Sequence, residues 1–265
     1  MTNPAETYEE FFVPVIFGPA AGQLVEIAAP VAGDQVLDVA CGTGAVLRRV
    51  AAVIGNAGAL HGVDTNPAML AVARRVADRD GLSAELHETS VDALPFAEGV
   101  FDVVLCSQGL QFFPDRRAAL AEMHRVLRPG GRLAVGVWQD LSRHPFQLAH
   151  LRALEAHLGV RGATTPFSLG DEDELRALLE EAGFETVAVE SATITGQAEE
   201  PDELVARMTD AASAGVPAMQ QLEASERQGV VEAVTHDLRP QLEELTNDGR
   251  VALTFHAHLA RATRG

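Results

Sequence analysis

A short apolar segment followed by a glycine-rich turn constrains the fold of this chain more than any other feature. Residues 36–39 read Val-Leu-Asp-Val, and the turn after them contains Gly42 and Gly44. Residues 45–54 then carry apolar side chains at helical spacing. Glycine permits backbone conformations that a Cβ atom forbids and lets a ligand approach the main chain. A strand, a tight turn and a helix in this order predict an open α/β sheet that binds a small molecule at the carboxyl ends of its strands.

The spacing within the turn separates several kinds of nucleotide loop. A dinucleotide-binding loop places a third small residue three positions after its second glycine, where the helix packs on the strand. This chain has Leu47 at that position. A phosphate-binding Walker loop ends in Gly-Lys-Ser or Gly-Lys-Thr, and this turn contains no lysine. Two readings stay open: a loop for another small molecule, or an ordinary flexible turn.

A second apolar run, residues 59–64, ends in Asp64. This carboxylate follows the glycine turn by about 20 residues, the spacing at which a doubly wound sheet presents an acid to a ribose. One carboxylate matches two adjacent hydroxyl donors well. Asn66 and Pro67 then supply an N-cap and a first-turn proline for the next helix. Asp64 is therefore predicted to bind a ribose, and the alternative is an exposed loop carboxylate.

Two further segments follow in order. The turn Ser-Val-Asp-Ala-Leu-Pro-Phe at 90–96 lies between strand candidates at 84–89 and 101–106. A helical stripe then ends at Pro129 and a glycine pair, before a fifth strand that runs to Trp138. Four landmarks thus occupy residues 36–138 in a fixed order.

Together these landmarks resemble the class I S-adenosylmethionine (SAM) dependent methyltransferases. The turn corresponds to their motif I, and Arg-Val-Leu-Arg-Pro-Gly-Gly-Arg-Leu at 125–133 resembles the small-molecule branch that includes the ubiquinone/menaquinone methyltransferases. The resemblance implies an α/β, Rossmann-like sheet of seven mostly parallel strands with an antiparallel last strand and helices on both faces. It also implies SAM as cofactor, with S-adenosylhomocysteine as its product.

The resemblance assigns roles to residues. Asp64 would bind the ribose hydroxyls, Thr65 and Met69 would line the adenosine, and Asp92 with the backbone of Ala93 would face the adenine amino group. A helix near the N-terminus would close over the cofactor, and its tyrosine, the only one in the chain, is a candidate contact to the SAM carboxylate. The predicted cofactor-binding set is Tyr8, Asp38, Ala40, Gly42, Gly44, Asp64, Thr65, Met69, Asp92, Ala93, Ser107 and Gln108.

Methyl transfer from a sulfonium depends mainly on positioning and desolvation, and a base is needed only for a poorly acidic acceptor. Many relatives carry a histidine where this chain has Gln111, which can orient an acceptor but cannot take its proton. His144 is the predicted substrate-side base, with a structural histidine as the alternative. No metal site is predicted, because the histidines lack carboxylate or cysteine partners at ligand spacing. The segment 107–110 also lacks the Asn-Pro-Pro-Tyr motif of enzymes that methylate nucleic-acid or protein amino groups.

Composition limits partners and location. The 265 residues carry a net charge of −18, which disfavours nucleic acid and anionic membranes. No apolar stretch of spanning length and no signal peptide is evident in the sequence, so a cytoplasmic protein without a membrane partner is expected. The two cysteines, Cys41 and Cys106, are interpreted as core residues.

The rest of the chain completes a single domain over 1–265. Residues 1–30 are predicted to form the lid and 31–142 the SAM-binding core. A helix beginning after Asp171, a sixth strand at 184–190 and a seventh at 251–260 are expected. Helical insertions at 145–170 and 201–248 are interpreted as a substrate cap, the alternatives being a thicker core or a dimer surface. Either a monomer or a homodimer fits this pattern.

The predicted function is transfer of a methyl group from SAM to a small, fairly hydrophobic metabolite such as a quinone, a polyketide-like ring or another secondary metabolite. Two other classes of function are alternatives to methyl transfer. A nicotinamide oxidoreductase is opposed by Leu47 and by the Arg-Pro-Gly-Gly segment at 128–131. A SAM-fold protein that catalyses another reaction, such as a cyclisation, or that acts as a binding module stays open, because cofactor motifs persist without methyl transfer.

Overall fold

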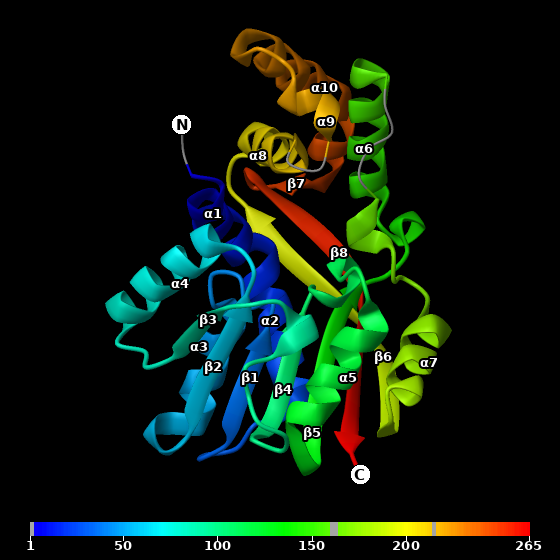
Figure 1. Ribbon diagram of the computed structural model, residues 1–265. Helices are drawn as coiled ribbons and strands as arrows, with labels where there is room; N and C mark the ends of the chain where they lie inside the picture. The colour runs from blue at the N-terminus through cyan, green and yellow to red at the C-terminus, as the bar shows by residue number, and fades with distance from the viewer. Residues whose placement is uncertain (1–2, 160–163, 214–215) are drawn as a thin grey trace.

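The computed structural model describes residues 3–159, 164–213 and 216–265. Its centre is one sheet in the order β3-β2-β1-β4-β5-β8-β6, with the short β7 paired to β8 (Figure 1). Strands β1 to β5 pair in parallel, whereas β8 runs antiparallel to β5 and β6. The predicted Rossmann-like sheet with an antiparallel last strand is confirmed, and the two-residue β7 is an addition to it.

The elements follow the predicted order closely. The strands are β1 Gln35–Val39, β2 Ala59–Asp64, β3 Glu85–Glu88, β4 Phe101–Ser107, β5 Leu127–Trp138, β6 Phe184–Ala198, β7 Thr246–Asn247 and β8 Arg250–Arg264. The helices are α1 Pro4–Thr7, η1 Tyr8–Phe17, α2 Gly18–Ala28, α3 Ala45–Ile54, α4 Pro67–Asp80, α5 Arg116–Val126, α6 Pro145–Leu158, α7 Glu172–Glu181, α8 Pro201–Ser213, α9 Pro217–Gln220 and α10 Ala224–Leu245. Single turns of helix lie at η2 Gly55–Ala57, η3 Val91–Ala93, η4 Leu110–Phe112, η5 Leu141–Arg143 and η6 Thr165–Phe167.

Both faces of the sheet are buried, which is why its central strands are continuously apolar. In β1, Val36 belongs to the core on the face covered by α2, α3 and α4, and Leu37 to the core on the face covered by α5 and α7. Val103 and Val104 alternate in the same way along β4. This alternation fixes the register, because a slip of one residue would exchange the two cores.

Helix ends agree with the capping signals, with one exception. The side chain of Asn66 accepts hydrogen bonds from two backbone N–H groups at the start of α4, and Asp171 caps α7 in the same manner. The helical stripe before Pro129 was expected to include Leu127, but α5 ends one residue earlier, at Val126. Leu127 pairs with Phe101 of β4 and so begins β5.

The order of the strands creates a crevice. From β1 the chain proceeds outward through β2 to β3, then returns to the other side of β1 as β4. The loops that leave the carboxyl ends of β1 and β4 therefore diverge to opposite faces of the sheet. In open α/β sheets this topological switch point is where ligands bind.

A helical cap rises beyond this carboxyl edge. Trp138, the last residue of β5, pairs with Ala257. Residues 252–256 of β8 therefore pair with β6 alone among the strands, and Val251 pairs with both β6 and β7. This extended β6–β8 hairpin carries α8, α9 and α10 at its end, and α6 packs against α10 (Figure 1). Helices α6, α8, α9 and α10 lie within the ranges 145–170 and 201–248, apart from residues 160–163 and 214–215, which lie outside the described part of the chain. That these ranges form a substrate cap stays a prediction.

The N-terminal helix is longer and more apolar than the sequence analysis expected. Segments α1, η1 and α2 form one continuous helix, Pro4–Ala28, that is long and apolar enough by length and composition to cross a membrane. Within it η1 is a π-helix, and the N–H of Gly18 donates to the carbonyl of Val13. Half of the most apolar window (50%) is buried inside the protein, where the helix packs against β6, α3 and α4. That burial is typical of a core helix. The expectation that no apolar stretch has spanning length was nevertheless wrong, because this helix has it.

Gly196 on β6 makes this packing possible, since a Cβ atom there would overlap the carbonyl of Val15 in η1. We therefore expect Gly196→Ala to lower the free energy of unfolding by about 1–3 kcal/mol through overpacking. Gly229 is the matched control, because it lies in α10 with nothing near its missing Cβ. Gly229→Ala should raise stability by about 0.5–1 kcal/mol. Denaturant unfolding measures both, and a Gly196→Ala protein as stable as wild type would contradict the close approach.

Candidate functional site

The crevice between β1 and β4 opens into a cavity of about 590 Å³. It is walled by the loops after β1, β2 and β4, by η3 and by the N-terminal helix. Nine of the fourteen predicted site residues line it: Tyr8, Ala40, Gly42, Asp64, Thr65, Met69, Asp92, Ser107 and Gln108. The remaining five do not line this cavity, and each is described below: Asp38, Gly44, Ala93, Gln111 and His144.

Asp38 lies at the end of β1, beside a small hollow that Tyr8, Ala40 and Ser107 also line. Its side chain is buried, with a residue exposure of 1%. Neither carboxylate oxygen has a hydrogen-bond partner among the described residues. Burial, reinforced by the negative charge of Asp64, raises the pKa of Asp38 well above its ordinary value. A buried acid in this state is stabilised by a positively charged ligand group.

Asp64 holds the glycine turn, a structural role that sequence reasoning missed. Its Oδ2 accepts a hydrogen bond of 2.9 Å from the N–H of Gly42, and its Oδ1 accepts one of 2.8 Å from the N–H of Asn66. Each carboxylate oxygen keeps further acceptor capacity. The carboxylate is therefore fixed in orientation while it faces the cavity.

The turn itself uses left-handed backbone conformations at Ala40, Gly42 and Gly44, with φ of +57°, +53° and +85°. Gly44 does not line the cavity; its N–H donates to the carbonyl of Cys41 at 2.8 Å and it begins α3. Ala93 also lies outside the cavity lining, and its carbonyl accepts from the hydroxyl of Thr89 at 3.4 Å. Gly44 and Ala93 therefore shape the loops beside the cavity.

Tyr8 covers the cavity from the N-terminal helix. Its ring stacks on Phe17 with centroids 4.7 Å apart. Burial, followed by the charges of Asp64 and Asp38, raises the pKa of the Tyr8 hydroxyl, which keeps it a neutral donor. The helix is tied down by Arg48 of α3, which forms an ion pair of 3.1 Å with Glu9 and donates to the carbonyl of Thr43 at 3.0 Å.

A second, apolar chamber of about 530 Å³ lies beneath the cap. Tyr8, Phe17 and Phe112 line both this chamber and the cavity, so the two spaces share a wall. Trp138 and Phe255 contribute from β5 and β8. Phe112 is 52% exposed in the loop after β4. Phe112 was not among the predicted site residues, although an aromatic pair shortly after the end of β4 was a usable signal.

Two polar side chains of α6 face this chamber, Gln147 and His150. Gln147 is 4% exposed, and both its amide nitrogen and its amide oxygen lack partners among the described residues. The Nε2 atom of His150 lies 3.0 Å from the hydroxyl oxygen of Thr209 on α8. Burial lowers the pKa of His150 to about 4, so its imidazole is neutral at pH 7.

His144 and Gln111 do not occupy the positions expected of catalytic residues. His144 is fully buried (0% exposed) outside both lining sets. Its Nδ1 lies 3.1 Å from the carbonyl oxygen of Asp140, and its Nε2 accepts the N–H of His256 at 3.0 Å. Because both ring nitrogens are engaged with backbone and burial lowers its pKa, His144 ties η5 to β8, and a base role there is not supported. Gln111 donates to the amide oxygen of Gln108 at 3.1 Å and so orients a residue of the cavity.

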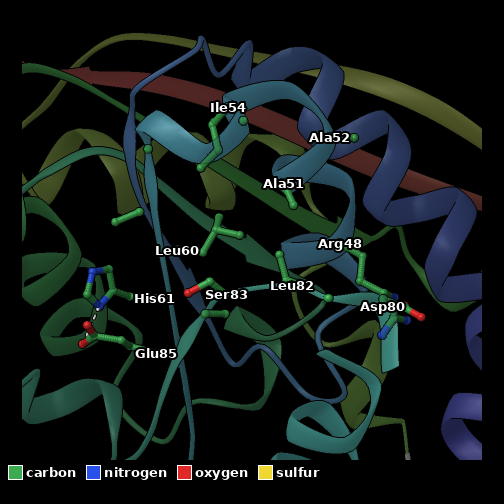
Figure 2. Close-up of a pocket in the computed structure, with 15 residues that line it drawn as sticks. Arg48, Ala51, Ala52, Ile54, Leu60, His61, Asp80, Leu82, Ser83 and Glu85 are labelled. Atoms are coloured by element: carbon green, nitrogen blue, oxygen red, sulfur yellow. Dashed lines mark ion pairs between the residues drawn. The ribbon is translucent and has the colours of Figure 1, made fainter. Parts of the chain in front are cut away.

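A third hollow, of about 600 Å³, lies between α3 and the start of β2 and β3. None of the fourteen predicted residues lines it. Figure 2 shows His61 and Glu85 facing each other at its side, with 3.6 Å between Nδ1 and the carboxylate. With His87 they place three ligand-type atoms within 4.8 Å of one another. Sequence spacing did not indicate this group, because His61 lies on β2 whereas Glu85 and His87 lie on β3. The absence of a metal site stays a prediction.

An open sheet with a glycine turn at its switch point and an acid at the next strand end defines a Rossmann-like protein that binds a nucleoside-containing ligand. The family model described as "Methyltransferase domain" matches residues 36–131. The chain is 32% identical over 178 residues to the ubiquinone/menaquinone biosynthesis C-methyltransferase UbiE of Shewanella halifaxensis, covering 62% of this chain and 71% of that protein. It therefore belongs to the class I SAM-dependent methyltransferases of the small-molecule type, and SAM is its cofactor.

Further comparisons agree with this family. The chain is 37% identical over 131 residues to the aklanonic acid methyltransferase DauC of Streptomyces sp. (strain C5), a match that covers 49% of this chain and only 59% of DauC. A SAM-dependent methyltransferase from Aquifex aeolicus superposes with a TM-score of 0.55 at 18% identity, covering 73% of this chain and 94% of that one. The [4+2]-cyclase SpnF superposes with a TM-score of 0.57 at 22% identity, covering 92% and 80%. Both structural likenesses show the fold alone.

The lowered pKa of His150 generates a prediction about pH. An unfolded histidine titrates near 6.5, whereas His150 in the folded protein titrates near 4. The unfolded state therefore binds the extra proton first, and stability is lost as pH falls from about 6.5 toward 4. Between pH 7 and pH 5 this group alone should lower the free energy of unfolding by about 1–2 kcal/mol. Denaturant unfolding of wild type and His150→Gln across this range measures the difference; parallel profiles would contradict it.

Proposed function

We propose that this protein transfers a methyl group from SAM to a small, fairly hydrophobic metabolite by in-line displacement. The observation that carries the proposal is the wall shared by two spaces, of which one presents carboxylates and the other none. A cavity that presents the carboxylates of Asp64 and Asp92 adjoins a chamber lined mainly by aromatic and aliphatic side chains. Tyr8, Phe17 and Phe112 lie between the two. A polar cofactor and an apolar acceptor would meet at this wall.

The residues of the cavity and of the small hollow beside it fit the cofactor. Asp38 is a buried carboxylate without a partner among the described residues, and SAM carries positive charges on its sulfonium and amino groups. Asp64, held by Gly42 and Asn66, would accept the ribose hydroxyls. Met69 and Asp92 would border the adenine, and the neutral hydroxyl of Tyr8 would donate to the carboxylate.

When bound, SAM supplies a methyl group whose bond to sulfur breaks as the bond to the acceptor forms, leaving S-adenosylhomocysteine. The chain's own contribution is to position the acceptor and exclude water from the chamber. His150, with a pKa near 4, is a weak base at pH 7, and the Tyr8 phenol stays protonated. The acceptor would therefore supply its own nucleophile, such as an acidic hydroxyl or an electron-rich ring carbon.

The nature of the acceptor is also part of this proposal. UbiE and DauC are named for ubiquinone/menaquinone biosynthesis and for aklanonic acid. Together with the aromatic chamber, these names support a quinone, a polyketide-like ring or another secondary metabolite. The net charge of −18 supports a cytoplasmic protein whose partner is a small molecule, with neither nucleic acid nor membrane. A monomer or a homodimer is compatible with this role.

Calorimetry followed by product analysis tests the proposal. SAM and S-adenosylhomocysteine should both bind, and NAD should not. A naphthol and quinone panel incubated with SAM should yield a product heavier by one methyl group in mass spectrometry. Absence of binding by either SAM species would overturn the cofactor assignment. Conversion of an acceptor with unchanged mass would instead favour a cyclase-like reaction on the same fold.

Asp64→Ala should weaken SAM binding by about 1.5–3 kcal/mol, because it removes a charged acceptor of the ribose hydroxyls. The variant also frees the N–H of Gly42, so its unfolding must be measured alongside its affinity. Asp64→Asn, which keeps the size and one acceptor oxygen, should fall between wild type and Asp64→Ala in calorimetry. A stable Asp64→Ala protein with unchanged SAM affinity would sink the ribose assignment.

A further inference from the structure

Packing alone does not explain one side chain in the apolar chamber, that of Gln147. It lies on α6, one helical turn from His150 and Leu151, and all three line the chamber. Its residue exposure is 4%, and neither its amide nitrogen nor its amide oxygen has a hydrogen-bond partner among the described residues. Other buried glutamines differ from it: Gln139, for example, donates both to Ser191 and to the carbonyl of Ala257.

An unpaired buried amide is costly, and the great majority of such groups in folded proteins have a partner. A leucine or methionine at position 147 would fill the same space without that cost. Because both the donor and the acceptor of the amide are free, the missing partner must both accept and donate a hydrogen bond. No Asp, Glu, Lys or Arg lines the chamber in the described part of the chain, so a neutral partner is favoured over a charged one.

The surroundings of Gln147 define the shape of that partner. The rings of Trp138 and Phe255 lie 4.9 Å apart at the sheet side of the chamber, and Phe17 approaches Trp138 at 6.4 Å. Phe167 closes the chamber from η6. Aromatic walls of this kind match a flat ring system, which gains contact area and offset stacking from them.

We propose that Gln147 determines acceptor specificity by hydrogen bonding to a neutral pair of oxygen groups, a hydroxyl and a carbonyl, on a planar ring compound. This inference rests on the proposed function, since it places the methyl acceptor in the apolar chamber. Gln147 acts on binding and orientation of the acceptor. His150, held by Thr209 at 3.0 Å, lies beside it as a neutral neighbour.

The chain offers a direct probe of the chamber, because Trp138 lines it and is the only tryptophan. Three naphthalenes of similar size would be titrated in the presence of S-adenosylhomocysteine, with fluorescence corrected for ligand absorbance and calorimetry as a second readout. They are 2,3-dihydroxynaphthalene, in which one hydroxyl is free to donate while the other oxygen accepts, 2-acetonaphthone with an acceptor alone, and 2-ethylnaphthalene with neither. Wild type should bind the first about tenfold more tightly than the last.

Gln147→Met is the decisive variant. It should bind the three naphthalenes within about twofold of one another, leave S-adenosylhomocysteine affinity unchanged, and unfold at the same or a higher denaturant concentration than wild type. Gln139→Met is the matched control, because it removes an amide that already has partners. It should lose stability yet keep the wild-type preference among the naphthalenes.

The outcomes separate this inference from the proposed function. If S-adenosylhomocysteine binds and the naphthalenes are not discriminated by wild type, or if Gln147→Met keeps the preference, the role of Gln147 is overturned while the methyltransferase assignment stands. A Gln147→Met protein that is markedly destabilised would also overturn it, since the amide would then have a structural partner. If S-adenosylhomocysteine itself fails to bind, the proposed function fails first.

Discussion

The carboxylate of Asp64 is the interaction on which the rest of the site depends. Through its two oxygens it joins the turn after β1, at Gly42, to the start of α4, at Asn66. These two loops leave neighbouring parallel strands, and without a cross-link each would be free to move over the crevice. One side chain thus sets the distance between the part of the cavity that would hold a methionine moiety and the part that would hold a ribose.

This cross-link has an electrostatic consequence. Fixing Asp64 places its charge near Asp38, which is buried and has no partner among the described residues, and burial with that charge raises the pKa of Asp38. Two acids held in this way are stabilised by a cationic group placed beside them. The same charges act on Tyr8 and keep its phenol protonated. The carboxylates at the cavity therefore favour the positively charged end of a ligand.

Sequence patterns predicted the strands, the turns and most of the cavity, because those features depend on neighbours close in the chain. Val36 and Leu37 alternate between two cores, and Asp38 and Asp64 lie at strand ends by that same periodicity. His144 shows the limit of this reasoning. Its partner, the N–H of His256, lies on β8, and only the antiparallel register of β5 and β8 brings the two together. His61 and Glu85 meet in a comparable way, because the parallel register of β2 and β3 places them opposite each other.

The apolar chamber was the least predictable part, and its construction explains why. Many of its walls come from α6, α8 and η6, which lie beyond the parallel sheet, and α6 and α8 both pack on α10. The N-terminal helix, Trp138 and Phe255 supply the rest of the aromatic lining. None of these contacts is required by the parallel sheet itself, so the cap can change its side chains while the cofactor loops stay in place. An unpaired amide such as that of Gln147 is tolerated in such a cap because the stability of the sheet does not depend on it.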